Sequence, residues 1–294
     1  MGLKYAPPRL FIQISFFLLM FIIPVLNIYE IYFLTGTYYA LSFGGLGVAD
    51  PVVILQAMFA SGQLTIPLLS AALFPFLVAL LLGRVWCGWL CPYLFIADRI
   101  DSIRRFILRK IFFDQKESMK KTGSSFRANF VRFSFLIVGT AMGGILGIPL
   151  LNYFSAPGIL STEAMIFVKE RSFSIEIMFL AILFGLQLTI LPRFWCRLFC
   201  PTGSLLSTIR SPLTLRVEFV GKISSAPCCK ENSCSEVCPM GLKPFMESRD
   251  LLCVNCGRCV NACNFNRLRF GGLGSVSQSL FPKTTLREEN LETR

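Results

Sequence analysis

Four cysteines near the C-terminal end of this 294-residue chain stand at a spacing that suits metal-cluster chemistry. They form the series Cys-x2-Cys-x2-Cys-x3-Cys, with members at Cys253, Cys256, Cys259 and Cys263. Three thiolates this close in sequence can wrap one corner of a cubane iron–sulfur cluster, while the fourth reaches a neighbouring cluster. Zinc competes poorly, because structural zinc sites usually use two separated cysteine pairs. The run therefore predicts iron–sulfur ligation.

A second cysteine series precedes the first and is imperfect. Cys228, Cys234 and Cys238 keep the spacing, but Glu231 stands where another cysteine is expected, and Cys229 adjoins Cys228. Eight cysteines suit two 4Fe-4S clusters that exchange ligands between the two series. The first cluster is then expected on Cys238, Cys253, Cys256 and Cys259, and the second on Cys234, Cys263 and one or both of Cys228 and Cys229. A three-iron cluster, or loss of the second site, stays open because of Glu231.

A tryptophan–cysteine motif occurs twice, at the end of each of two long apolar stretches. Both copies read Arg-x-Trp-Cys-x3-Cys-Pro, with Cys87 and Cys91 in the first and Cys196 and Cys200 in the second. Recurrence of so specific a pattern indicates an internal duplication. On a helix, the cysteines of each pair face one side, so four thiolates could converge. They could hold a further iron–sulfur centre, form two thiol/disulfide pairs, or pack as small apolar side chains.

The elements that must position these cysteines are membrane helices. Hydrophobic residues make up 54% of the chain and charged residues 16%, and the apolar residues gather in blocks long enough to cross a bilayer. Histidine is absent. Its absence excludes histidine-ligated haem, Rieske centres and histidine-bound zinc or copper, and the chain has no haem attachment motif. The sequence therefore predicts a membrane protein without haem.

Four spans are predicted, at residues 10–31, 64–82, 130–153 and 174–191. The segment 32–63 contains no lysine or arginine, whereas nine of them lie between Arg99 and Arg127. The positive-inside rule therefore places both termini, the basic loop and both cysteine motifs on the cytoplasmic side. The basic loop is expected to set this topology and to meet anionic membrane lipid. No nucleic-acid partner is expected, because no nucleic-acid-binding motif accompanies the basic residues.

The predicted fold is an all-α membrane protein with four transmembrane helices in two duplicated hairpins, followed by a small ferredoxin-like α+β domain. Residues 1–215 are expected to form the membrane domain, 216–270 the 4Fe-4S domain and 271–294 a flexible tail. Glycines 44, 45 and 47, just before Asp50, could line a quinone pocket or a re-entrant turn, although such glycines more often serve helix packing. Asp50 and Glu163 are either proton acceptors or ordinary loop acids.

These features together resemble the NapH/MauN ferredoxin-type membrane proteins, with related modules in the NosR and CcoG types. The resemblance covers residues 5–270. It implies that electrons leave a membrane quinol pool and pass through iron–sulfur centres to a partner oxidoreductase or electron-carrier subunit. It also implies that the motif cysteines are the family's membrane-edge cysteines, and that the family's cluster ligands match Cys228, Cys234, Cys238, Cys253, Cys256, Cys259 and Cys263.

The leading hypothesis is an electron-transfer subunit of the bacterial cytoplasmic (inner) membrane, similar to a quinol dehydrogenase and not a stand-alone enzyme. Its expected partners are membrane lipid, quinone or quinol, and an oxidoreductase. The alternative is an assembly or maturation factor that supplies electrons to reduce a metal centre or thiol on a client protein. Neighbouring genes would discriminate the two, because a respiratory subunit should lie beside reductase or dehydrogenase genes.

Overall fold

The computed structural model describes most of the chain. It covers residues 6–30, 34–44, 46–62, 65–111, 125–189, 193–209, 211, 214–219, 233–246, 250–263 and 267–271. Cys228, Cys229 and Glu231 lie outside the described residues, as does the predicted tail after Gly271.

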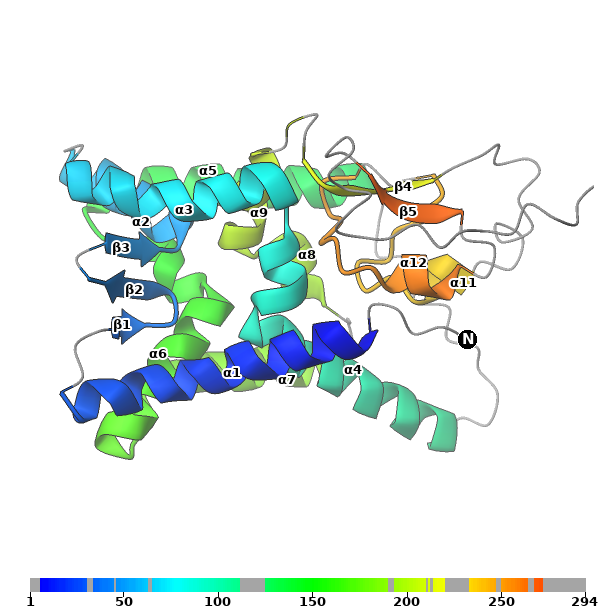
Figure 1. Cartoon of the computed structure of the whole chain (residues 1–294), viewed down its shortest axis with the longest axis horizontal. Coiled ribbons are helices and arrows are strands. Elements are labelled where there is room, and N and C mark those ends of the chain that lie inside the picture. Colours follow the sequence, from blue (N-terminus) through cyan, green and yellow to red (C-terminus); the bar gives the residue numbers. More distant parts are fainter. Residues whose placement is uncertain are drawn as a thin grey trace, which may run out of the picture.

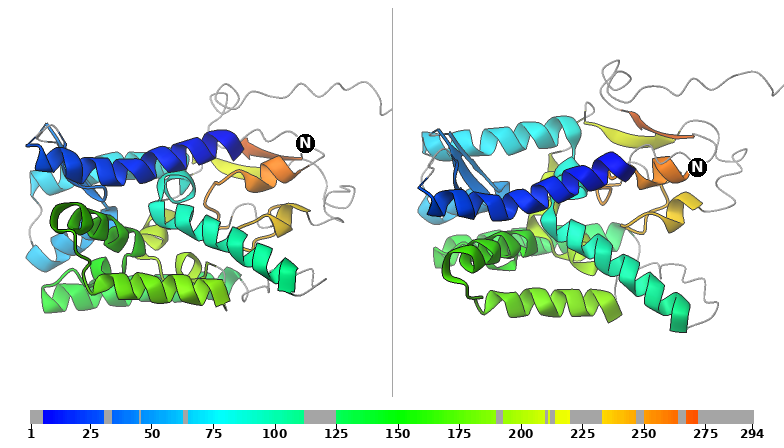
Figure 2. Two further views of the ribbon diagram at one scale, coloured as in Figure 1. Left: turned by 90° about the horizontal axis from the view of Figure 1, so that it is seen from below. Right: turned by 60° about the horizontal axis from the view of Figure 1, so that its bottom comes forward.

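Four apolar helices run along the long axis of the molecule (Figures 1 and 2). They are α1 (Ala6–Ile28), α3 (Ile66–Leu82), α5 (Ser125–Leu146) and α7 (Glu176–Thr189). Among the described residues, α1 and α5 are long and apolar enough to cross a membrane, and α7 qualifies as a third span only together with the bent segment 194–208. The apolar helix α3, with 17 residues, is shorter than α1 and α5. Two of the four predicted spans therefore have full-length helices.

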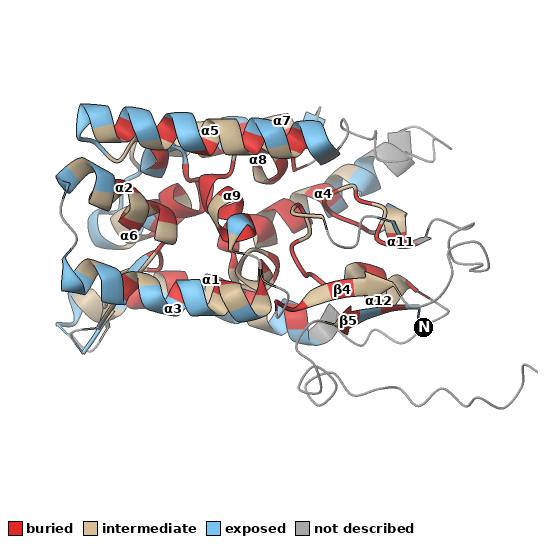
Figure 3. Ribbon diagram, turned by 90° about the horizontal axis from the view of Figure 1, so that it is seen from above, coloured by how far each residue is buried: buried red, intermediate tan, exposed pale blue. Residues whose placement is uncertain are grey.

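The outer faces of these helices expose large apolar side chains. Phe11 is 73% exposed, Ile66 85% and Ile145 84%. Figure 3 shows exposed residues along the outside of the bundle and buried residues in its middle. Such helices would be unstable against water but suit a lipid environment, where apolar surface carries no penalty. The arrangement is that of a membrane protein.

One end of the bundle is closed by a small sheet and shorter helices. Strands β1 (Leu34–Thr37), β2 (Ala40–Phe43) and β3 (Leu46–Ala49) form an antiparallel meander, and α2 (Pro51–Ser61) follows it in the chain. The 3-10 helix η2 (Leu150–Phe154) and helix α6 (Ala156–Glu170) come from a later segment, after α5. The sheet packs between α1 and α3 (Figure 1). Of the glycines that precede Asp50, Gly44 lies in the turn after β2 with a φ of 53°, and Gly47 lies in β3, while Gly45 is outside the described residues.

The two cysteine motifs fold inside the bundle. The first copy forms the π-helix η1 (Trp86–Leu90) and leads into α4 (Pro92–Ile111), while the second forms α8 (Phe194–Leu198) and leads into α9 (Pro201–Thr208). Each proline begins the helix after its cysteine, since a first helical position needs no N–H donor. The chain bends by 100° between α7 and the segment 194–208. Figure 2 shows α4 projecting past the other helices.

The C-terminal cysteines belong to a small α+β unit at the opposite end from the β1–β3 sheet (Figure 1). Strands β4 (Arg216–Phe219) and β5 (Leu268–Gly271) pair antiparallel, and the short helices α11 (Ser233–Glu236) and α12 (Arg258–Ala262) pack together. The N-terminal end of α1 lies at this same end of the molecule.

Candidate iron–sulfur site

Four cysteines of the C-terminal unit line one pocket. They are Cys238, Cys253, Cys256 and Cys259, the set expected to hold the first cluster. The pocket encloses about 410 Å³ together with its open mouth, and its other walls are mainly apolar, including Val217, Pro239 and Leu242. A cubane cluster takes four thiolates in an apolar shell. The donor set and its surroundings therefore fit a 4Fe-4S cluster.

The thiols in this pocket need a positive partner to ionise. Burial, together with the neighbouring Cys256 and Cys253, raises the pKa of the Cys238 thiol to about 12. Burial and the same neighbours also hold the pKa of Cys259 well above its ordinary value. Iron binds the thiolate form of cysteine. The positive charge of the iron would stabilise the thiolates, which the apolar walls cannot do. Among the described residues, no three acidic or cysteine side chains are close enough to hold a single metal ion.

The second predicted cluster site is described only in part. Cys234 and Cys263 are buried in one apolar cluster with Leu215, Val217 and Leu268. The Sγ atom of Cys263 accepts a hydrogen bond from the backbone N–H of Arg267 at 3.3 Å. Cys228 and Cys229, the other expected ligands, lie outside the described residues. The structure thus brings two of the four expected ligands into one neighbourhood.

The cysteines of the duplicated motif gather in the middle of the molecule. Cys91 and Cys200 are buried in the main apolar core, and Cys87 and Cys196 pack against it. Cys196 lies within electrostatic range of the other three thiols. Convergence arises although the local geometry differs from a plain helix: Cys91 ends a π-helix, and Cys200 is the N-cap of α9.

The same apolar core contains Cys238 and Cys256 of the C-terminal unit. The contact is close at Gly88, where a Cβ atom would lie 2.3 Å from the carbonyl oxygen of Val254. Beside it, Trp89 Nε1 donates a hydrogen bond to the carbonyl of Asn255 at 3.0 Å. The first motif therefore docks directly against the loop that carries Cys253 and Cys256.

Two buried arginines, one within each copy of the motif, reach the two C-terminal cysteine series: the repeated Arg84, and Arg197 at a variable position of the second copy. Arg84 donates to the carbonyl of Leu251 at 3.0 Å, and Arg197 donates to the carbonyl of Met240 at 3.0 Å. Each arginine is buried, so each carbonyl is held by a charge-assisted bond away from water. Both copies of the motif thus position the loops that line the cysteine pocket.

Asn255 is a site residue that sequence reasoning missed. It adopts a positive φ of 50° between Cys253 and Cys256, and it is almost fully buried. Its Nδ2 group donates to the carbonyls of Leu82 at 3.0 Å and Leu215 at 2.6 Å. Asparagine tolerates the left-handed region better than most residues. An asparagine between clustered cysteines was the signal available in the sequence.

Asp98 is a second residue that the sequence did not single out. Its buried carboxylate accepts from Arg9 Nη2 at 2.9 Å and Arg258 Nη2 at 2.6 Å, and it also pairs with Arg193. Burial alone would raise the pKa of Asp98, but the three arginines lower it below its ordinary value of 3.8. One carboxylate therefore joins α1, the second motif and the start of α12, between Cys256 and Cys259.

The described residues thus combine an apolar helix bundle, two repeated cysteine motifs and a docked cysteine pocket, and comparisons with known proteins point in the same direction. The 4Fe-4S binding domain family matches residues 64–111 and 173–222, and each match contains one copy of the motif. The chain is 26% identical over 250 residues to the ferredoxin-type protein NapH of Escherichia coli, covering 80% of this chain and 79% of the relative.

Two further relatives extend the comparison. The methylamine utilization ferredoxin-type protein MauN of Paracoccus denitrificans is 27% identical, covering 67% of this chain and 62% of the relative. An uncharacterized protein of Methanocaldococcus jannaschii is 25% identical, covering 72% and 70%. No solved structure matches the chain. The predicted resemblance to NapH/MauN ferredoxin-type proteins is confirmed, and the family match supports iron–sulfur clusters in this chain.

The family match lies around the two motifs and ends at residue 222, ahead of the C-terminal cysteine series. The placement of a ferredoxin-like domain at 216–270 therefore stays a prediction, as do the individual cluster ligands.

Proposed function

We propose that this protein is a multi-pass electron-transfer protein of the cytoplasmic membrane that moves electrons between a quinol pool and a partner oxidoreductase. Two 4Fe-4S clusters carry the electrons, one on Cys238, Cys253, Cys256 and Cys259, the other on Cys234, Cys263 and one or both of Cys228 and Cys229. Iron–sulfur clusters exchange single electrons, whereas a quinol releases two. The named relatives and the family match support this proposal.

The observation that carries the proposal is the shared core. Cys238 and Cys256 from the cysteine pocket and Cys91 and Cys200 from the membrane motifs are buried in one apolar cluster. Electrons from the lipid phase would reach the pocket through packed protein, with water excluded. Buried surroundings and hydrogen bonds to the sulfurs would set the reduction potential of the pocket's cluster.

The chain's own residues have definite tasks in this scheme. The four pocket thiolates hold the cluster, and Arg84 and Arg197 fix the loops that present them. The cysteines of the two motifs supply either a further iron–sulfur centre or thiol pairs between the membrane and the pocket. The basic segment that begins in α4 meets anionic lipid on the cytoplasmic side.

Iron analysis of anaerobically purified full-length protein tests the cluster assignment. About eight irons per chain are expected for two cubanes, with more if the motif cysteines hold a third centre. Cys256→Ser should remove the first cluster and Cys263→Ser the second, and each loss is read by EPR spectroscopy. Iron near four in the parent protein would contradict the two-cluster assignment.

The quinol link has its own readout, which is the EPR signal of the clusters during titration with a short-chain quinol. We expect quinol to reduce the clusters of the parent chain, and dithionite to serve as the positive control. Cys87→Ser and Cys196→Ser should block reduction by quinol while dithionite still reduces the clusters. If quinol reduced both variants at the parent rate, the motif cysteines would be packing residues.

A further inference from the structure

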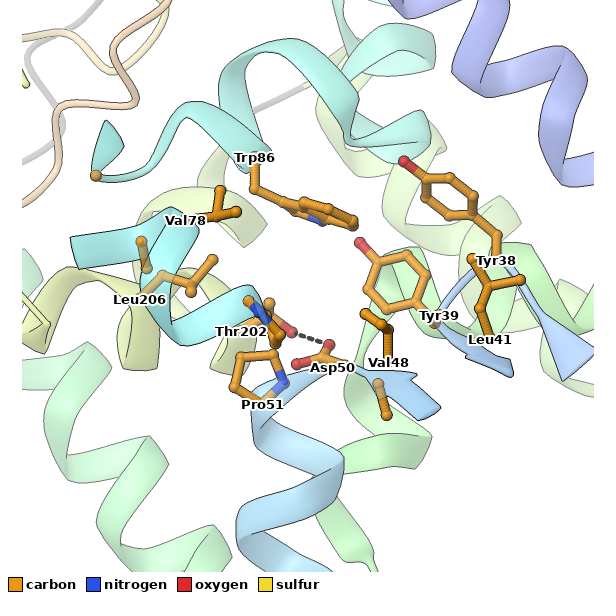
Figure 4. A pocket seen from close by; sticks show the side chains of 14 residues that line it. Tyr38, Tyr39, Leu41, Val48, Asp50, Pro51, Val78, Trp86, Thr202 and Leu206 are labelled. Atoms are coloured by element: carbon orange, nitrogen blue, oxygen red, sulfur yellow. Dashed lines mark hydrogen bonds between the residues drawn. The ribbon is translucent and has the colours of Figure 1, made fainter. Parts of the chain in front are cut away.

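A second cavity lies in the membrane part of the molecule, between α3, the β1–β3 sheet and the two motifs (Figure 4). It encloses about 510 Å³ together with its open mouth. Pro75, Val78 and Ala79 of the apolar helix α3 form one wall. The other face of α3 exposes apolar side chains, so the cavity lies directly behind a surface that suits lipid.

A buried carboxylate points into this cavity. Asp50 is only 6% exposed, and its two oxygens accept from the Val52 backbone N–H at 2.9 Å and from the Thr202 hydroxyl at 2.6 Å. In the part of the chain that the structure describes, no lysine or arginine forms an ion pair with it. An uncompensated carboxylate in apolar surroundings is costly, and such residues in membrane proteins commonly serve proton transfer.

The first copy of the motif and the residues just after the second copy contribute to the cavity wall. Trp86 belongs to the first copy, and Thr202 follows the second directly after Cys200-Pro201. The hydroxyl oxygen of Tyr39, another lining residue, lies 4.0 Å from the Sγ atom of Cys91. A ligand in this cavity would therefore have a proton acceptor in the cavity wall, and Cys91 beside the Tyr39 hydroxyl.

The aromatic lining indicates a flat ligand. The rings of Tyr38 and Trp86 stack with centroids 6.1 Å apart, and Tyr39 packs edge-on against Tyr38. Aromatic walls suit a planar ring. The hydroxyl oxygens of Tyr39 and Thr202, whose own protons are donated to Cys91 and Asp50, can accept hydrogen bonds from the O–H groups of such a ring. A planar, apolar molecule that releases protons and electrons together is a quinol.

We propose that this cavity binds the ring of a membrane quinol and that the Asp50 carboxylate accepts its protons, an inference that rests on the quinol-linked function proposed above. Each of the two O–H bonds of the quinol breaks in turn. One electron would pass each time to an oxidised iron–sulfur centre, which the chain's cysteines would hold. The proton passes to Asp50, which releases it to water before it accepts the second. The products are one quinone, two protons and two reduced centres.

The variant Asp50→Asn separates proton transfer from structure. Asparagine is as good an N-cap as aspartate, so α2 keeps its first hydrogen bond, but the amide cannot accept the proton. Reduction of the clusters by a short-chain quinol should slow by about 100-fold or more. Reduction by dithionite, the iron content and the binding of quinone should stay at the parent level. A parent-level rate with quinol would overturn the role of Asp50.

Binding is tested independently with azido-quinone photoprobes on the purified full-length protein. Labelled peptides should fall within residues 38–51, 75–86 and 202–206. Val78→Phe, which fills the cavity, should lower labelling by about tenfold. Leu77→Phe on the same helix is the matched control, because Leu77 is 44% exposed and outside the cavity lining, and it should label like the parent.

The two sets of measurements separate this site from the proposed function. If quinol reduces the parent clusters, but Asp50→Asn and Val78→Phe react at the parent rate, the site is wrong and the quinol link stands. If dithionite reduces the parent clusters and quinol does not, the quinol link fails. In that case label outside the cavity overturns the site as well, whereas label confined to the cavity supports it as a quinone-binding site.

Discussion

Gly88 lies where the first membrane motif packs directly against the C-terminal cysteine loop. Its carbonyl accepts from Arg9 Nε at 2.9 Å and Gln13 Nε2 at 3.3 Å, which holds η1 against α1. Its other face meets the Val254 carbonyl, where a Cβ atom would approach to 2.3 Å. The Gly88 backbone cannot move away without breaking its hydrogen bonds to Arg9 and Gln13, so an added side chain would strain the docking.

The change Gly88→Ala should therefore loosen the C-terminal unit. We expect a loss of about 1–3 kcal/mol, typical of overpacked sites, seen as faster proteolysis of the C-terminal unit and lower iron retention. Gly185→Ala in α7 is the matched control, because an added Cβ there meets nothing within 4 Å and alanine favours the helix. Equal protease sensitivity of both variants would refute the close contact.

The buried carboxylate of Asp98 contacts three arginines, so its replacement should strongly destabilise the protein. Asp98→Asn leaves Arg9, Arg193 and Arg258 without their shared counter-charge, and we expect a loss of about 3–5 kcal/mol in the free energy of unfolding. Glu218→Gln is the control, because the Arg216–Glu218 pair is partly exposed and should contribute less than about 1 kcal/mol. Denaturant titration in detergent compares the two variants.

The pH dependence of this stabilisation follows from the lowered pKa of Asp98. A depressed carboxyl contributes stability that is fully present above its ordinary value of 3.8 and is lost as the pH falls through the folded-state pKa. The difference between the parent and Asp98→Asn should thus be constant near neutral pH and shrink only in acid. A difference that already shrank between pH 8 and 6 would contradict this assignment.

At the scale of the elements, α9 depends on one buried arginine of α5. Arg132 is fully buried and donates to the carbonyl of Gly203 at 2.8 Å and to the hydroxyls of Ser204 and Ser207 at 3.3 and 3.1 Å. Helix α9 has only eight residues, too few to persist by itself. The planar guanidinium holds it beside Cys200.

Arg132→Lys should release α9, because an ammonium group cannot reproduce the forked geometry. We expect a loss of about 1–3 kcal/mol and faster hydrogen exchange in residues 201–208. Arg99→Lys is the control, since Arg99 is exposed on α4 and only lies over the ring of Phe95. Unchanged exchange in α9 would show that other contacts hold this helix.

At the scale of the whole molecule, periodicity and cysteine spacing predicted the apolar helices and the four pocket cysteines. The third predicted span ran to Tyr153, but α5 ends at Leu146 because Gly147, with a φ of 68°, turns the chain. The predicted helical placement of the motif cysteines was only approximate, because tertiary contacts produce the π-helix η1.

Contacts between distant segments could not be predicted from local patterns. Arg132 lay inside a predicted span, and a lone charge in such a span indicates a buried partner without naming it. The partners of Asp98 are 89, 95 and 160 residues away along the chain. Asp50 could be read as a loop acid until the fold placed Thr202 beside it. The sequence shows which residue types are present, but only the packed fold shows which of them are in contact.

The orientation of the molecule in the membrane gives the last prediction. The N-terminal end of α1 lies at the same end as the C-terminal unit, and the β1–β3 sheet lies at the other (Figure 1). The basic residues of α4 then belong on the cytoplasmic side. An epitope inserted after Gly62, which is exposed, should bind antibody on intact spheroplasts, whereas one added after Arg294 should bind only after permeabilisation. Measurement of the iron content checks that both tagged proteins fold. The reverse labelling pattern would show that the topology is inverted and that the cysteine pocket lies outside the cell.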